Sequence, residues 1–470
     1  MDEKGLPFSG PNAPRWLHPI KYFVFAAFAV SALVYLAKPV TGGQAKNNGE
    51  LARLGERLFN DERFSSAKGD LSSSCSHCHL YETNSNMARA FTDSFARSWI
   101  PWRPEDPRRE GARNSPTLFD MADMPRLHSD GEFESLEQLV RGTLSGRPFG
   151  WLPGEEGEAF QQIYSVVMND KGAGGSYREQ FGKAFGVDMG RLGRDAVVDL
   201  VSKALSDYLR TLRSSRTSPY DQFVEANGLE TGPKTGEGPG AFAARMLKHI
   251  SDMESRGELK TPEGFGPEAL SGMKVFFRTE GSSSAGNCVS CHAPPLFTDF
   301  SFHNIGITQS EYDQIHGDGS FAALKIPGAS EALRPSGNFR EAASRQSPGN
   351  VDLGHWNNVS LSRSPLRRKG EGDDQFLRRM IATFKTPTLR NLSYSQPYMH
   401  NGGYPSLESA LAELLRMSSL ARSGRAREAD EGLAGIRITE ADIRPLIAFL
   451  NALNEDLKPR LSAGAPTGGM

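Results

Sequence analysis

The sequence is poor in cysteine, in net charge and in long apolar runs. Its 470 residues include only four cysteines. The 54 basic residues nearly balance the 56 acidic ones, so the composition gives no reason to expect a nucleic-acid partner. No sustained alternation of apolar and polar residues appears, which argues against a large sheet. What remains is a mainly α-helical protein, long enough for two or three domains.

All four cysteines fall in two short motifs, 75–79 and 288–292, which both read Cys-x-x-Cys-His. This pattern is the attachment sequence of a c-type haem. Two thiols on one turn reach the two vinyl groups of one porphyrin, and the following histidine supplies a nitrogen to the iron. No cysteine is left for a disulfide. The predicted haem-binding residues are Cys75, Cys78, His79, Cys288, Cys291 and His292.

Two other interpretations of these motifs fit less well. Structural zinc, with His77 as an extra ligand, would need further cysteines or paired histidines at ligand spacing. A redox dithiol needs neither the histidine nor a second copy. We therefore predict two covalent haems, with His79 and His292 as their iron ligands.

One uncharged apolar run, residues 22–37, lies near the N-terminus. As a helix it would be about 24 Å long, slightly short for the hydrocarbon core. Residues 1–21 carry basic side chains and are long for a signal-peptide leader. We expect a transmembrane anchor after a cytoplasmic leader, with a cleaved signal peptide as the alternative. Either one places the haem motifs on the periplasmic side of the bacterial inner membrane.

Apolar residues recur at helical spacing in several places. We expect helices at 51–58, 197–212, 241–253 and 270–277, and a last one that begins at Thr439. The expected organisation is a linker (38–50), an N-terminal cytochrome c domain (51–227), a Gly- and Pro-rich connection (228–266) and a C-terminal cytochrome c domain (267–460). Residues 307–374 are long, polar and weakly periodic, which indicates an insertion in the second domain.

An internal repeat supports two related domains. Both copies contain a Pro-Thr-Leu segment, an Asp-Gly or Asn-Gly pair, and a Phe-Thr-Asp segment after the haem motif. The repeated segments are 114–118 and 385–389, 130–131 and 401–402, and 91–93 and 297–299. We therefore expect an internal duplication with one haem in each copy.

At these residues the chain resembles the di-haem cytochrome c peroxidase/MauG family. The resembling segments are 54–59, 113–117, 297–306, 384–391 and 397–402. The resemblance implies that the N-terminal haem splits hydrogen peroxide. It implies that the C-terminal haem takes electrons from a small donor, such as a cytochrome c or a cupredoxin, or from a protein substrate. It also implies calcium between the domains, held by Asn114 and by the main-chain oxygens of Ser395 and Pro397.

The chain departs from the family around the first haem. No histidine lies between His79 and His128, where the family carries a removable distal ligand, so we expect a five-coordinate haem. Met87 is an alternative sixth ligand or a core residue. Gln138 stands beside the position of the family's pocket glutamine, which Leu139 occupies. We predict Gln138 as a catalytic residue that hydrogen-bonds but cannot relay a proton.

Three further family positions differ. Ser129 replaces the bridging tryptophan, and Trp151 is either its substitute or a packed residue. The family's pocket glutamate is missing, and Glu155 or Glu156 is either its substitute or part of a surface turn. Leu414 stands where the second haem's distal ligand is expected. Met417, three residues on along a helix, is our predicted ligand, with core packing as the alternative and His355 as a further substitute.

Three functions agree with this reading. The first is a di-haem peroxidase that reduces hydrogen peroxide at the N-terminal haem with electrons delivered through the C-terminal haem. The second is a MauG-like haem oxidase that modifies a partner protein. The third is a non-enzymatic two-haem electron carrier.

Overall fold

The computed structural model describes residues 42–82, 89–106, 108–172, 174–281, 283–331 and 337–457. The predicted leader and anchor (1–37) and Met87 lie outside the described residues. Contacts divide the chain into Met1–Ala45 and Lys46–Met470, and nearly all described elements belong to the second unit. None of the helices described is both long and apolar enough to cross a membrane.

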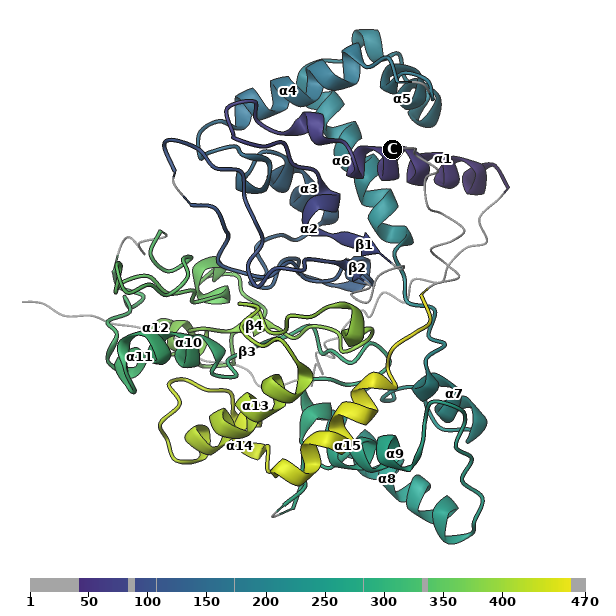
Figure 1. Cartoon of the computed structure of the whole chain (residues 1–470), viewed down its shortest axis with the longest axis vertical. Coiled ribbons are helices and arrows are strands. Elements are labelled where there is room, and N and C mark those ends of the chain that lie inside the picture. The colour runs from purple at the N-terminus through teal and green to yellow at the C-terminus, as the bar shows by residue number, and fades with distance from the viewer. Residues whose placement is uncertain are drawn as a thin grey trace, which may run out of the picture. The chain divides into compact units, whose positions relative to one another are not determined.

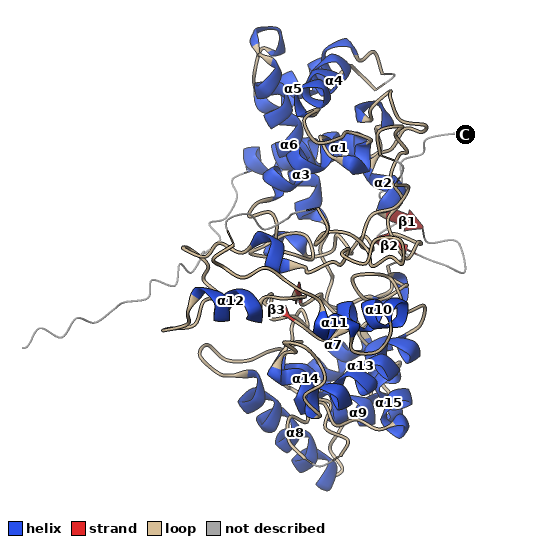
Figure 2. Ribbon diagram, turned by 90° about the vertical axis from the view of Figure 1, so that its left-hand side faces the viewer, coloured by secondary structure: helices blue, strands red, loops and turns tan. Residues whose placement is uncertain are grey.

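Helices dominate both halves of the described chain (Figures 1 and 2). The first half contains α1 (Gly42–Phe59), α2 (Cys75–Cys78), β1 (Leu80–Glu82), β2 (Arg89–Thr92), α3 (Leu136–Leu144), α4 (Glu156–Asn169), α5 (Tyr177–Phe185) and α6 (Arg194–Thr211). The second half contains α7 (Pro219–Ala226), α8 (Pro239–Ser255), α9 (Pro267–Phe277), β3 (Phe302–His303), α10 (Ile307–His316), α11 (Ser320–Ala323), α12 (Asp373–Arg379), β4 (Phe384–Lys385), α13 (Leu407–Arg422), α14 (Glu431–Gly435) and α15 (Glu440–Asn451). β1 pairs with β2 and β3 pairs with β4, both antiparallel.

The predicted helices are present, with longer bounds at several ends. The last one begins as expected, because Thr439 and Asp442 form a capping box at the start of α15. α1 already begins at Gly42, so the predicted linker 38–50 is partly helical. Its polar sequence gave no apolar period there, although polar residues other than proline can continue a helix.

Apolar side chains form two main cores. The first core contains residues of α1, α3, α4, α5 and α6. The second contains residues of α7, α8, α9, α13 and α15. The predicted connection 228–266 is not a free linker, because Phe242, Ile250 and Phe265 are fully buried in the second core. Tyr220 also lies in this core. The change from one core to the other therefore falls between Leu212 and Tyr220.

The repeat is visible in the backbone as well as in the sequence. Equivalent residues of the two copies share a positive φ, which non-glycine residues rarely adopt. The pairs are Asp120 and Asn391 (56° and 62°), His128 and Met399 (63° and 69°), and Gly131 and Gly402 (70° and 59°). The two copies therefore have the same turns at the same positions, which confirms the repeat.

The two copies meet along a seam with approximate twofold symmetry. The Asn114 amide donates to the His400 carbonyl (2.8 Å), and the Lys385 amide donates to the Ser129 carbonyl (2.7 Å). By the repeat, Asn114 is equivalent to Lys385 and Ser129 to His400. Each copy therefore gives and receives the same bond, as in an isologous interface between subunits.

The insertion 307–374 is folded rather than loop-like. Together with α12 and the residues after it, it builds a third core around Phe321, Leu353 and Trp356. Its Asp352 accepts two hydrogen bonds from Arg113 of the first copy (2.5 and 2.8 Å). The insertion thus contacts both copies.

Candidate haem sites

The first motif forms a single helical turn, α2. The His79 amide donates to the Cys75 carbonyl (2.9 Å), which closes the turn and places both cysteines on it. The His79 Nδ1 lies 3.1 Å from the Phe91 carbonyl oxygen. Burial lowers the pKa of His79 to about 4, so this ring is neutral and donates from Nδ1. Its Nε2 is left for a metal.

The second motif repeats this arrangement. Cys288–Ser290 form a 3-10 turn, and the His292 amide donates to the Cys288 carbonyl (2.8 Å). The His292 Nδ1 lies 2.9 Å from the Phe297 carbonyl oxygen, and burial lowers the pKa of His292. Phe91 and Phe297 are equivalent residues and both have a positive φ, 57° and 56°. The same strained turn therefore orients the imidazole in each copy.

These observations fit a c-type haem at each motif. All four cysteines are free, and in each motif the two thiols lie on one turn, directly before the histidine that a phenylalanine carbonyl orients. Burial raises the pKa values of Cys75 and Cys288 to about 12, as expected for thiols in apolar surroundings. The importance of Phe91 and Phe297 was missed from the sequence, although the repeated Phe-Thr-Asp segment marked their positions.

A charged cluster lies beside the second motif. His303 bonds Asp299 through Nε2 (2.8 Å) and Asp430 through Nδ1 (2.7 Å). Burial lowers the pKa of His303, but the two carboxylates outweigh it and raise the pKa to about 12. His303 is therefore an imidazolium, and its nitrogen lies within 4.8 Å of the Cys291 sulfur. In the first copy, Arg97 stands at the equivalent position and pairs with Glu311 instead.

The structure places the predicted pocket residues of the first copy in ordinary roles. Gln138 is exposed, and its Oε1 accepts from the Glu134 amide (3.2 Å), so the side chain serves the start of α3. Trp151 is buried in the first core, where its Nε1 donates to the Phe64 carbonyl (3.1 Å). Its contacts are those of a packed residue.

Glu155 is fully engaged by other groups. Arg103 donates two hydrogen bonds to it (both 2.9 Å), and the Leu152 amide donates a third. Hydrogen bonds from Arg103 are the main reason that the pKa of Glu155 falls to about 2. It therefore stays ionised and cannot give a proton to a leaving oxygen. Glu156 is exposed at the first turn of α4.

Met417 is not part of the second core. It is fully buried, and a Cβ added at Gly306 would lie 2.2 Å from its Cε. Its Sδ lies 3.2 Å from Arg416 Nη2. Leu414, not Met417, belongs to the apolar cluster that contains Cys288. The packing interpretation therefore explains every described contact of Met417.

Of the predicted calcium ligands, Asn114 and Pro397 come together at the seam. Asn114 Nδ2 lies 2.7 Å from the Pro397 carbonyl oxygen, and Asn114 Oδ1 is buried without a hydrogen-bond partner. Rotation of the Asn114 side-chain amide by 180° would place its oxygen, rather than its nitrogen, beside the Pro397 carbonyl oxygen. A cation bound between the two would require this orientation. Arg89 donates to the neighbouring Gln396 carbonyl, so a positive charge already lies beside this position.

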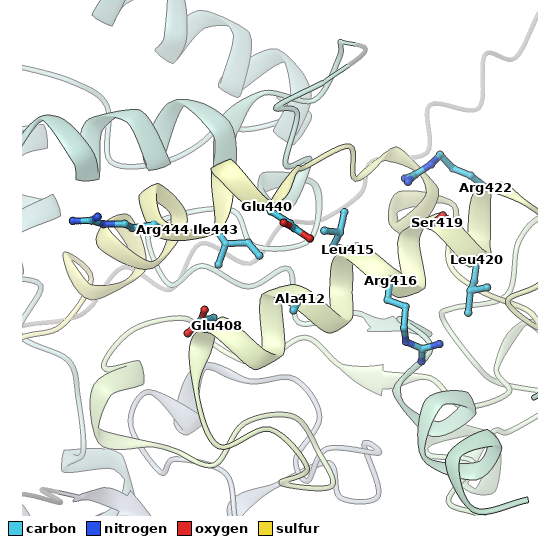
Figure 3. A pocket seen from close by; sticks show the side chains of 10 residues that line it. All are labelled: Glu408, Ala412, Leu415, Arg416, Ser419, Leu420, Arg422, Glu440, Ile443 and Arg444. Carbon is cyan, nitrogen blue, oxygen red and sulfur yellow. The ribbon is translucent and has the colours of Figure 1, made fainter. Parts of the chain in front are cut away.

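Two cavities lie outside the haem motifs. A groove of about 810 Å³ runs between α13 and α15 (Figure 3), and residues of mixed charge surround its apolar floor. A second, of about 400 Å³, lies beside α12 and includes Phe302 and Asp430. No cysteine or histidine is among the residues that line either one. The lining residues drawn in Figure 3 include Glu408, Leu415, Arg416, Glu440, Ile443 and Arg444.

Comparison with known proteins agrees with this geometry. Residues 49–228 match the family model described as di-haem cytochrome c peroxidase. The cytochrome-c peroxidase IdrP2 of Denitromonas iodatirespirans is 23% identical over 89% of this chain and 85% of its own length. The methylamine utilization protein MauG of Methylophilus methylotrophus is 24% identical over 86% of this chain and 82% of its own length.

Solved structures show the same fold. A MauG-like protein associated with microbial copper homeostasis matches with a TM-score of 0.51 and 20% identity, over 92% of this chain and 96% of that one. The diheme peroxidase BthA of Burkholderia thailandensis matches with a TM-score of 0.51 and 21% identity, over 89% and 88%.

The chain is similar to the di-haem cytochrome c peroxidase/MauG family, over residues 49–228 by the family model and over most of its length by its relatives. It is an oxidoreductase with two c-type haems, and its described part has the mainly helical fold of the diheme peroxidases.

Proposed function

We propose that this protein reduces hydrogen peroxide at the haem bound by Cys75, Cys78 and His79. Electrons would enter through the haem bound by Cys288, Cys291 and His292, from a small protein donor such as a cytochrome c or a cupredoxin. Reduction of one peroxide to two waters consumes two electrons and two protons. The observation that carries the proposal is the pair of matched motifs, in each of which a phenylalanine carbonyl orients the histidine through its Nδ1.

A haem held by Cys75, Cys78 and His79 would supply an iron that can react with peroxide. The chain's own contribution is to fix His79 through the Phe91 carbonyl and to surround the motif with the first core. Gln138 stays a proposed pocket residue, and it would have to leave the Glu134 amide to act there. Since Glu155 is held by Arg103, we propose that protons come from water rather than from this carboxylate.

A MauG-like oxidation of a partner protein is the second candidate. A relative named MauG covers most of the chain. A carrier without enzymatic activity would show neither reaction.

Electron paramagnetic resonance of the oxidised holoprotein, followed by peroxide assays, separates these functions. We expect one high-spin and one low-spin haem, and consumption of peroxide with a reduced cytochrome c as donor. Turnover only when a protein substrate is added would favour the MauG-like reaction. Two low-spin haems without turnover would overturn both enzymatic proposals.

We also propose calcium between Asn114, Ser395 and Pro397, completed by water, because calcium takes six to eight oxygen ligands. The buried, unpartnered Asn114 Oδ1 supports this site, whereas the charge on Arg89 opposes tight binding. Metal analysis of the purified protein should find calcium that a chelator removes readily. Protein that contains no calcium after purification in its presence would refute the site.

For location, we propose that residues 22–37 anchor the protein to the inner membrane, with both haem motifs in the periplasm. The apolar run and the basic residues before it are the support. Fractionation of expressing cells tests this, since an anchored protein stays with the membranes in high salt. Recovery of a shortened, soluble periplasmic form would indicate a cleaved signal instead.

A further inference from the structure

The insertion places a histidine at the seam between the two copies. His355 is 5% exposed, and its backbone amide donates to the Thr383 carbonyl (2.8 Å). Its Nδ1 lies 2.7 Å from the Asp130 carbonyl oxygen of the first copy. The side chain is therefore fixed to both copies at once.

The His355 ring is stacked on Phe302 of the second copy. The ring centroids are 4.0 Å apart and the planes differ by 17°. Gly131 lies against this pair: a Cβ added there would be 2.4 Å from the Phe302 ring and 3.2 Å from His355 Nδ1. A side chain at position 131 would push the two copies apart, so glycine allows this close approach.

Contacts continue from this stack towards both haem motifs. On one side Phe302 precedes His303, whose nitrogen lies within 4.8 Å of the Cys291 sulfur. On the other side Asp130 and Gly131 follow His128, whose charge acts through space on His79. A series of bonded and packed groups thus runs from the second motif to His128, and the last step to His79 is through space.

Electron tunnelling is faster through bonded and closely packed groups than across gaps. We infer that His355 and Phe302 form the contact through which electrons cross from the second haem to the first. This inference rests on the proposed function and specifies its internal route. One electron passes at a time, from the haem at Cys288 to the haem at Cys75, while no bond of His355 forms or breaks.

His355 is held in place for this role, and the insertion that carries it would therefore take part in electron transfer. Burial lowers the pKa of His355, so the ring stays neutral while electrons pass. Asp352, three residues earlier, is tied to Arg113. Trp356, the next residue, packs on Phe339 with ring centroids 5.2 Å apart. The ring therefore has little freedom to leave the stack.

The test measures internal electron transfer in the holoprotein after one-electron reduction by a photochemically generated flavin radical. His355→Leu removes the ring, and His355→Phe keeps a ring but removes the bond to Asp130. We expect a loss of internal rate in His355→Leu, a retained rate in His355→Phe, and unchanged reduction potentials of both haems. Phe302→Leu should lose rate in the same way.

Phe384→Leu tests an alternative route, because Phe384 pairs with His303 between β3 and β4 and stacks on His400 in the same fashion (3.6 Å, 10°). A rate that falls in Phe384→Leu and not in His355→Leu would overturn the route. So would equal losses in His355→Leu and His355→Phe, or an unchanged rate in His355→Leu. No internal transfer in the wild-type protein would instead overturn the proposed function itself.

Discussion

The two haem motifs have nearly the same backbone and different surroundings. In both, the histidine is aimed by the carbonyl of a phenylalanine with positive φ, Phe91 or Phe297. Beside the second motif, however, the His303 imidazolium lies between two carboxylates. Beside the first, Asp93 lies near Arg89 instead of a histidine, and burial raises its pKa.

This difference shows how a duplicated unit can acquire two roles. The backbone that holds the porphyrin is kept, because a change there would lose the iron ligand. The charges around it are free to differ, and they alter the relative energies of oxidised and reduced iron. Asp299 and Asp430 together outweigh the one charge of His303, which favours the oxidised form of the second haem.

Substitution of the two predicted iron ligands, His79 and His292, is expected to have the largest effects, and the two effects should differ. His79→Ala should abolish the reaction with peroxide, whereas His292→Ala should leave peroxide binding and abolish turnover with a protein donor. Stopped-flow spectra after peroxide addition and steady-state assays would measure both. Equal loss of peroxide binding in the two variants would contradict the division of roles, and full turnover in His79→Ala would refute the first site.

Among substitutions at the seam, we expect the loss of Arg113 to destabilise the protein most. This side chain pairs with Asp130 (2.8 Å) and Asp352, whose side chains are 1% and 5% exposed. Arg113→Ala leaves Asp352 without this ion pair and Asp130 with only Arg340 at 3.8 Å, and we expect a loss of about 3 kcal/mol in the free energy of unfolding. Urea unfolding would measure it. The control Arg191→Ala removes an exposed pair and should cost less than about 1 kcal/mol.

Glu155→Gln tests the ion pair between Glu155 and Arg103 in the first copy. Because Arg103 lowers the pKa of Glu155 from 4.5 to about 2, the ionised form stabilises the fold above pH 4.5. That contribution is lost as the pH falls towards 2. We expect Glu155→Gln to reduce the unfolding free energy by about 2 kcal/mol at pH 7 and by much less at pH 3. A difference that does not change with pH would contradict the ion pair.

Met417→Leu should have the smallest effect. Its described contacts are with Gly306 and Arg416, so we expect a loss below about 1.5 kcal/mol and an unchanged visible spectrum of the second haem. Thermal unfolding and absorption spectroscopy would measure the two. Disappearance of a methionine–iron band would instead identify Met417 as the ligand.

The sequence was most informative where local chemistry decides structure. The haem motifs, the capping box at Thr439 and the repeat need only short-range patterns, and the structure has all three. The insertion is different, because its core joins Phe321 to Trp356 and Phe376, which show no regular spacing. Nor could the sequence show that Gln138 turns towards its own helix, since either direction satisfies its amide.

The reciprocal hydrogen bonds of the seam have a consequence for how the protein behaves on dilution. Two separate subunits joined in this way would come apart at low concentration, and their electron exchange would stop. Here both partners are parts of one polypeptide, so the local concentration of each for the other is constant. Electron transfer between the haems should then be a first-order process at any protein concentration.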